Sequence, residues 1–330
     1  MSKRKRGSSR GFTHRKRKKE VASYAKNTRR EMEIWRERGK KIFEDNVDNH
    51  DDTLMFSKVD GEMGIEGLFK LKLSQKHFES IKSLHYLILE KVGESNMKSW
   101  CSKNSTEYLC SKKPPTRCYA FLPHSKYESA YALARKGGIE LFALETMNIE
   151  GGNLEDRECD KFANYASSVS LDFDDIDNGM MEALTHIIKT ARAKVAFKYM
   201  DCISLNNIAT LQPNLANDTD YLKCHIDSPL NDGLGVVILT IGISNDADIV
   251  LSDENDKKYF HFHLNPGEFY ILSGQSRNIY SHGVLCREND FGRQSLNIRF
   301  GLHSRTEPHR DKFCLKDEMP LFFFEDDDNN

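Results

Sequence analysis

The sequence predicts an α+β fold: a double-stranded β-helix, or jelly roll, with a helical N-terminal support. Two observations lead to this prediction. From residue 195 onwards the chain divides into short strand-like runs punctuated by Gly, Asn, Asp or Pro, and eight such runs at this spacing are typical of a jelly roll. Before residue 195, apolar residues recur at helical spacing, which favours helices that pack against one sheet.

The strand pattern predicts eight strands in the second half of the chain, at residues 202–210, 221–227, 235–243, 247–251, 259–264, 268–272, 279–285 and 295–301. The first half is expected to hold helices over 26–44, 74–94, 127–135 and 180–193, strands over 64–73 and 138–144, and loops over 98–118 and 171–177. Ser74 is the expected N-cap of the second helix.

Length and composition predict four segments. Residues 1–50 form a basic arm with a following helix, and residues 51–194 form a mixed helical support region. Residues 195–305 form the jelly-roll core, and residues 306–330 form a C-terminal extension with an acidic tail. No apolar run is long enough to cross a bilayer, so no membrane partner is expected. Eight scattered cysteines without a Cys-x-x-Cys pair argue against a zinc site and favour a reducing compartment.

Positive charge is concentrated at the start of the chain. Residues 1–30 hold 13 Lys and Arg against one acid, Glu20, whereas the rest holds 35 basic and 49 acidic residues. The runs 3–6 and 15–19 are typical of a two-part nuclear-localisation signal or a nucleic-acid patch. We expect an arm that is disordered when free, binds nucleic acid and directs the protein to the nucleus, with some in the cytoplasm. One alternative is a solvated tail without a partner. A mitochondrial transit peptide is a weaker alternative, because the arm contains dense blocks of lysine.

A candidate metal site begins at His225 and Asp227. Alternate residues of a strand point the same way, so these two side chains share a face. His282 is the candidate third ligand, from a later strand folded back onto the first. Two histidines and one carboxylate can occupy one face of an octahedral Fe(II) and leave the other face open. Exposed His and Asp are the alternative interpretation. His261 and His263 also share a strand face and are expected to be ordinary strand residues.

The run from Arg293 to Arg299 alternates polar and apolar residues. It places Arg293, Ser295, Asn297 and Arg299 on one face, although an exposed strand would show the same alternation. A guanidinium binds a carboxylate bidentately, so an arginine near a metal site suggests a dicarboxylate co-substrate on the metal.

At these residues the sequence resembles the AlkB-like family of Fe(II)/2-oxoglutarate-dependent dioxygenases, over roughly residues 195–305. The matching pieces are His225-x-Asp227, the stretch 274–284 around His282, and Arg293 followed six residues later by Arg299. The resemblance implies that the first three residues are catalytic iron ligands, that Arg293 binds 2-oxoglutarate, and that Arg299 lies near substrate and co-substrate. The implied cofactors are Fe(II), 2-oxoglutarate as co-substrate, and O₂.

The chain departs from the family pattern in one element that helps to hold 2-oxoglutarate. Nucleic-acid repair members carry Asn-x-Tyr before the His-x-Asp, and residues 211–217 offer no clean match. The local sequence around His282 resembles that of a divergent branch of the family. The resemblance and the basic arm together imply oxidative demethylation or hydroxylation of a nucleic-acid base, in DNA or RNA, with release of succinate and CO₂. A protein substrate for the same iron chemistry, or a non-catalytic nucleic-acid-binding scaffold, are the alternatives.

Overall fold

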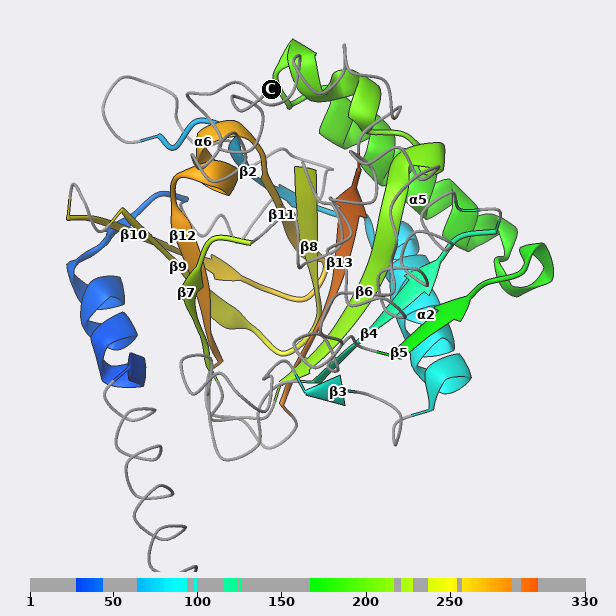
Figure 1. Cartoon of the computed structure of the whole chain (residues 1–330), viewed down its shortest axis with the longest axis horizontal. Helices are drawn as coiled ribbons and strands as arrows, with labels where there is room; N and C mark the ends of the chain where they lie inside the picture. The colour runs from blue at the N-terminus through cyan, green and yellow to red at the C-terminus, as the bar shows by residue number, and fades with distance from the viewer. Residues whose placement is uncertain are drawn as a thin grey trace, which may run out of the picture.

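The computed structural model describes ten stretches of the chain: residues 28–43, 64–93, 98–99, 116–123, 125, 167–216, 221–227, 237–253, 257–286 and 292–301. They form an α+β fold with two β-sheets that face each other, which confirms the predicted fold class. Helices cover the outer side of each sheet, as Figure 1 shows. No helix within these stretches is both long enough and apolar enough to span a membrane.

The smaller sheet has the strand order β1-β10-β9-β12-β7. Its strands are β1 (Lys40–Lys41), β7 (Tyr221–His225), β9 (Ala247–Asp253), β10 (Lys258–Leu264) and β12 (Ser281–Cys286). A helix over residues 28–38 lies on its outer face, where Met32 is buried against Tyr221, Val250 and Leu285.

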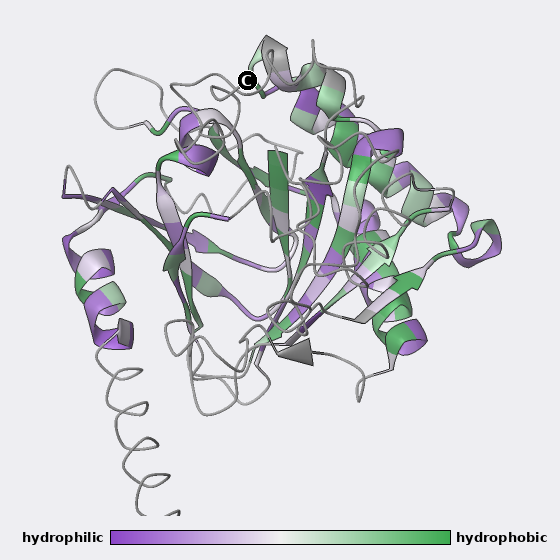
Figure 2. Cartoon of the chain, in the orientation of Figure 1, coloured by the Kyte–Doolittle hydropathy of each residue, from purple (hydrophilic) through white to green (hydrophobic). Residues whose placement is uncertain are grey.

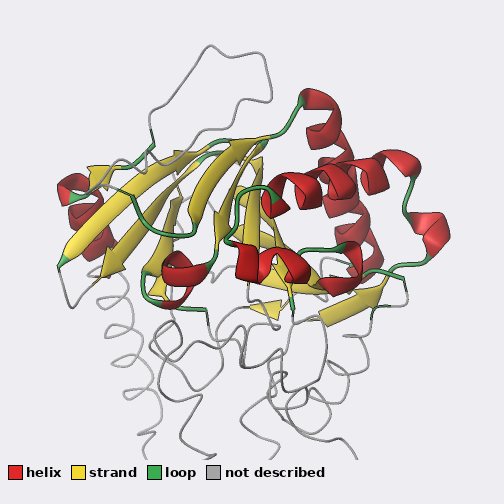
Figure 3. Cartoon of the chain, turned by 90° about the horizontal axis from the view of Figure 1, so that it is seen from above, coloured by secondary structure: helices red, strands yellow, loops and turns green. Residues whose placement is uncertain are grey.

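The larger sheet has the order β2-β11-β8-β13-β6-β4-β3, with β5 paired to β4. Its strands are β2 (Leu68–Lys72), β3 (Lys98–Ser99), β4 (Thr116–Phe121), β5 (Ser167–Ser170), β6 (Ile208–Ala216), β8 (Val237–Ser244), β11 (Glu268–Leu272) and β13 (Arg293–Phe300). Helices α2 (Gln75–Val92) and α5 (Asn178–Arg192) pack together on its outer face, as Figure 3 shows from above.

Alternation along the larger sheet creates its two different faces. Leu296, Ile298 and Phe300 of β13 join the main core beneath α2 and α5, so the residues between them face the smaller sheet. Figure 2 shows hydrophilic and hydrophobic residues alternating along β6 and β13. The space between the sheets is apolar at one end, where Phe262 and Leu272 pack. Its polar end is therefore the place where a site can form.

Most predicted elements occur with shifted ends. Ser74 caps α2, because its side chain accepts a hydrogen bond from the backbone N–H of His77 at 3.3 Å. Asp177 caps α5 in the same way through Met180. The predicted strand 268–272 is found unchanged as β11.

Four predicted elements are wrong in part. The strand expected at 202–210 begins only at Ile208, because two short 3-10 helices, Phe197–Cys202 and Leu205–Asn207, precede it. The loop expected at 98–118 contains β3 and the start of β4, whose residues Cys118 and Tyr119 are buried. The helix expected at 26–44 ends at residue 38 and leads into β1. The loop expected at 171–177 contains a short 3-10 helix, Phe173–Asp175.

The first half of the chain contributes strands as well as helices to the body of the protein. Strands β2 and β4, from the predicted support region, are hydrogen-bonded to β11 and β6 of the predicted core. The helix expected at 127–135 and the strand expected at 138–144 lie outside the described residues, as do most of the arm and residues 302–330. The division into four segments remains a prediction.

Candidate metal centre and co-substrate pocket

The three predicted metal ligands lie together at the polar end of the space between the sheets. His225 ends β7, Asp227 follows two residues later, and His282 lies on β12 directly opposite His225. One ligand atom from each residue lies within 4.8 Å of the others. Among the described residues, this is the group of His, Cys, Asp and Glu side chains with metal-ligand spacing. The strand pairing therefore unites the halves of a motif separated by 57 positions.

The hydrogen bonds of His225 fit a metal ligand. Its Nδ1 lies 2.8 Å from the carbonyl oxygen of Lys223, which can only accept, so the ring proton belongs on Nδ1. The lone pair of Nε2 then faces Asp227 Oδ1 at 3.1 Å. Two acceptors at this distance repel each other unless a cation or a proton lies between them. A metal ion bound by Nε2 and the carboxylate removes this conflict, with the backbone carbonyl holding the ring in the required tautomer.

Burial and charge set the protonation states that metal binding requires. Burial lowers the pKa of His282 to about 3, so its ring is neutral at physiological pH. Burial raises the pKa of Asp227, but the Arg299 guanidinium and the two histidines outweigh this effect and hold that pKa well below its ordinary value. Two neutral imidazoles and an ionised carboxylate are the forms in which these residues bind a metal. The buried Nδ1 of His282 has no hydrogen-bond partner within the described part of the chain.

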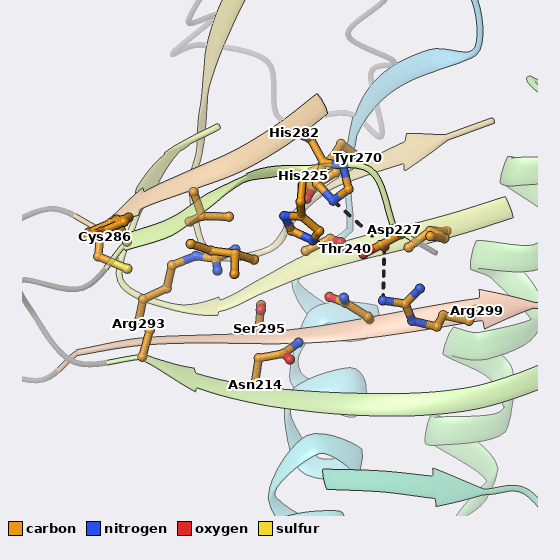
Figure 4. A pocket seen from close by; sticks show the side chains of 16 residues that line it. Asn214, His225, Asp227, Thr240, Tyr270, His282, Cys286, Arg293, Ser295 and Arg299 are labelled. Atoms are coloured by element: carbon orange, nitrogen blue, oxygen red, sulfur yellow. Dashed lines mark hydrogen bonds and ion pairs between the residues drawn. The ribbon is translucent and has the colours of Figure 1, made fainter. Parts of the chain in front are cut away.

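Arg299 supports the carboxylate from the larger sheet. Its Nη2 lies 3.1 Å from Asp227 Oδ2, and both side chains are buried. Its Nε donates to Gln212 Oε1 at 3.2 Å. Figure 4 shows the ion pair as a dashed line below the two histidines. Arg299 is therefore a counter-ion of the candidate metal ligand Asp227, and its contact with any substrate remains a prediction.

Arg293 is a second buried arginine that lines the same pocket. It is 6% exposed, and its Nε and Nη2 have no hydrogen-bond partner among the described residues. Buried donors of a charged group are costly to leave unpaired, so this arrangement fits a bound anion. Nε and one Nη atom of a guanidinium form a fork that matches a carboxylate. Arg293 is thus suited to hold the far carboxylate of a dicarboxylate whose other end reaches the metal centre.

The pocket floor contains polar residues that the metal motif did not identify. The predicted alternation of β13 is confirmed, because Arg293, Ser295, Asn297 and Arg299 all line the pocket. From the neighbouring strands come Asn214, Thr240 and Tyr270. Asn214 and Thr240 are polar residues in largely apolar strands, a signal that acquires meaning only when β6 and β8 are known to flank β13. Tyr270 comes from β11, which pairs with β8 on the side away from β13.

One other predicted assignment, that of His263, holds in the structure. His263 is an ordinary strand residue, whose ring contacts Asp246 at 2.8 Å and Asp248 at 3.3 Å. Arg36, in the helix of residues 28–38, forms an ion pair with the same Asp248 at 3.0 Å. This ion pair connects the helix to β9 of the smaller sheet. Cys224 is buried, with its thiol near the carbonyl of Val250, and is not one of the pocket-lining residues.

The pocket between the two sheets holds two histidines, one carboxylate and a buried arginine with two donors unpaired among the described residues, and the first three are the ligand set of non-haem Fe(II) oxygenases. The site is therefore suited to hold a metal ion beside an anionic co-substrate. No family model and no curated protein matches the chain.

Similar solved structures include OsALKBH1, with 14% identity and a TM-score of 0.41 over 72% of this chain and 99% of that one. A prolyl-4-hydroxylase from Pseudomonas putida shows 9% identity and a TM-score of 0.39, over 72% of this chain and 93% of that one. An oxidoreductase of the 2OG-Fe(II) oxygenase family from Burkholderia pseudomallei shows 17% identity and a TM-score of 0.24, over 30% and 44%. Because these TM-scores are low, the function proposed below rests on the site residues.

Proposed function

We propose that this protein is an Fe(II)/2-oxoglutarate-dependent dioxygenase that demethylates or hydroxylates a nucleic-acid base. One observation supports the oxygenase chemistry above all others. The His225–Asp227–His282 cluster lines one pocket with Arg293, whose Nε and Nη2 have no hydrogen-bond partner among the described residues. Such a pocket offers a metal site at one end and an anion site at the other.

The residues of the pocket have distinct parts in this proposal. His225, Asp227 and His282 would hold Fe(II) on one face, and Arg293 would hold the far carboxylate of 2-oxoglutarate. When bound, Fe(II) with 2-oxoglutarate and O₂ supplies the oxidation of a substrate C–H bond, with release of succinate and CO₂. Arg299 keeps Asp227 ionised, and the hydrogen bond from His225 to Lys223 keeps the metal-facing nitrogen free of a proton.

The basic arm supports a nucleic-acid substrate because of where it joins the body. The helix of residues 28–38 follows the arm and packs on the sheet that holds both histidines. Arg29 near its start donates to the carbonyl oxygen of Cys286 at 3.3 Å, and Cys286 itself lines the pocket. The described chain thus begins next to a pocket-lining residue, and phosphate contacts by Lys and Arg of the preceding arm would hold a nucleic acid near the metal.

A protein substrate is the second candidate. In β6 the sequence runs Asn214-Leu215-Ala216, so an alanine stands two residues after the pocket-lining asparagine. The tyrosine of the Asn-x-Tyr element is thus absent, and Ala216 lies opposite Arg293 in the β6–β13 ladder. The chain departs here from the repair members that it resembles, which favours a different substrate.

The deciding experiment measures succinate formed from 2-oxoglutarate by purified, Fe(II)-loaded protein, with methylated oligonucleotides or methylated peptides as substrates. Formaldehyde released from oligonucleotides alone supports the nucleic-acid proposal, and release from peptides alone supports the second candidate. The Asp227→Asn variant is the control for iron that is not bound at the site. Absence of both succinate and bound iron in the unaltered protein would leave only the non-catalytic scaffold.

A further inference from the structure

Gln212 occupies an unexpected position for an uncharged amide. It lies in β6, is fully buried, and stands opposite Asn297 of β13. Its amide contacts two residues that line the pocket, Arg299 and Asn214. Its Oε1 accepts from Arg299 Nε at 3.2 Å, and its Nε2 donates to Asn214 Oδ1 at 2.7 Å. Gln212 therefore connects the counter-ion of a metal ligand with a residue that lines the pocket floor.

The direction of donation along this connection is fixed by chemistry. An arginine can only donate, so the oxygen of Gln212 must face Arg299 and its NH₂ group must face Asn214. Asn214 must then present its own oxygen to Gln212, which leaves its NH₂ group on the other side of the amide. One of these two N–H groups donates to the backbone carbonyl of Gln212 at 3.1 Å. Among the described residues the other N–H group has no hydrogen-bond partner, so it is available to an acceptor in the pocket that Asn214 lines.

We propose that Gln212 is a positioning residue. It orients Asn214 so that this side chain donates a hydrogen bond to a ligand whose oxygens can only accept. The inference rests on the proposed function, because the ligand is the 2-oxoglutarate of that same site. Hydrogen bonds run in one direction, from Arg299 through Gln212 to Asn214 and then to the ligand. Carboxylate and keto oxygens only accept, so the floor matches them and repels a ligand that presents an N–H or O–H there.

The same contact acts on the metal centre from the other side. The hydrogen bond from Nε fixes the plane of the Arg299 guanidinium, whose Nη2 lies 3.1 Å from Asp227. Without Gln212 the guanidinium loses one of its two partners and can turn away from the carboxylate. Gln212 thus orients both Arg299 beside the metal centre and Asn214 in the pocket floor, without being a ligand itself.

The experiment uses full-length protein loaded with Mn(II) in the absence of O₂, so that binding is measured without turnover. Calorimetry gives the affinity for 2-oxoglutarate of the unaltered chain, Gln212→Leu, Asn214→Ala and the double variant. Each single variant should bind about tenfold more weakly, as expected for one lost hydrogen bond to a charged group. The double variant should lose no more affinity for 2-oxoglutarate than the single variant with the larger loss, because both changes break the same chain of hydrogen bonds.

Thr210→Val is the matched control, since Thr210 is a buried residue of the same strand, opposite Arg299, whose hydroxyl has no partner in the described structure. It should leave the affinity unchanged. Additive losses in the double variant, or an unchanged affinity in Gln212→Leu, would overturn the positioning role. If Gln212→Leu does not fold, unchanged binding by Asn214→Ala overturns it equally. Failure of the proposed function gives a different result: the unaltered protein itself then shows no metal-dependent binding of 2-oxoglutarate.

Discussion

His225 and His282 are direct cross-strand neighbours on β7 and β12, with ring centroids 4.7 Å apart. The residue after His282 is Gly283, where the ladder shifts its register. A Cβ at Gly283 would lie 2.7 Å from both Cys224 Sγ and Met32 Cε, and 2.8 Å from the backbone oxygen of Leu222. The close approach of the two histidine strands therefore depends on a glycine, over which the first helix packs.

We expect Gly283→Ala to weaken metal binding and to lower the free energy of unfolding by about 2 kcal/mol, as overpacking does. The flexible Met32 can move, but the Leu222 carbonyl belongs to β7 and carries that strand with it. Chemical denaturation and metal titration measure the two effects. Gly179→Ala, near the start of α5, serves as the control because alanine favours a helix and the nearest atoms there belong to side chains. Equal changes of metal affinity and of unfolding free energy in Gly283→Ala and Gly179→Ala would contradict this explanation.

Asp227→Asn should abolish iron binding, because it removes the only anionic ligand of the cluster. It should also destabilise the metal-free protein by about 3 kcal/mol, since it leaves the buried charge of Arg299 without its counter-ion. Metal analysis and thermal unfolding test both statements. Replacing Arg299 by Gln in the same protein should restore part of the stability and none of the iron. A variant with full iron content would refute the metal assignment.

Arg293→Ala should weaken 2-oxoglutarate binding by at least tenfold, because a bidentate pair with a charged group contributes about 1.5–3 kcal/mol. Arg293→Lys should restore only part of the affinity, since lysine lacks the planar fork. Titration of the metal-loaded protein with 2-oxoglutarate gives these affinities. Arg36→Ala removes an arginine on the outer face of the smaller sheet and should leave them unchanged. Retained affinity in Arg293→Ala would place the anion site elsewhere.

The stability of the fold should depend on pH through His85 of α2. Burial lowers the pKa of His85 from 6.5 to about 4, although a hydrogen bond with Gln294 opposes the shift. Between these two values the unfolded chain binds a proton that the folded chain does not, so the free energy of unfolding falls as the pH falls. The full contribution is about 3 kcal/mol, present above pH 6.5 and lost on acidification toward pH 4.

Urea unfolding of the unaltered protein and of His85→Gln across this pH range measures the difference. The variant cannot titrate at this position, so its stability should fall less steeply with acid, while other groups contribute equally to both proteins. Parallel curves would show that the folded and unfolded states bind the proton at His85 equally well.

Deleting residues 1–27 should remove most non-specific affinity for nucleic acid and flatten its dependence on salt. Binding by Lys and Arg releases counter-ions, so the slope of affinity against salt reports the number of phosphate contacts. The truncation leaves the helix of residues 28–38 in place, and with it the buried Met32. Binding isotherms at several salt concentrations, with imaging of both proteins in cells, measure the slope and the nuclear signal.

A second variant replaces Lys and Arg in the runs 3–6 and 15–19 by Gln, at unchanged length. It should behave like the truncated protein if charge is the cause. If neither change alters the slope or the nuclear signal, the arm is a solvated tail and the protein-substrate candidate gains support.

The sequence by itself determined whatever depends on short-range periodicity. The alternation from Arg293 to Arg299 is a property of a strand with a repeat of two, and Ser74 identified the start of its helix through a local hydrogen bond. The strand expected at 221–227 ends at His225, so Asp227 lies just beyond it. These patterns hold in the structure because neighbouring residues alone specify which side chains share a face.

Only the tertiary structure decided which faces meet. No local pattern states that His282 pairs with His225, that Arg299 neutralises Asp227, or that Gln212 accepts a hydrogen bond from Arg299. Those contacts join residues separated by many positions, and they form because closing the two sheets buries their apolar faces and brings these polar groups together. The loop expected at 98–118 shows the same limit: its end becomes strand β4 because the edge of β6 offers hydrogen bonds that the local sequence does not reveal.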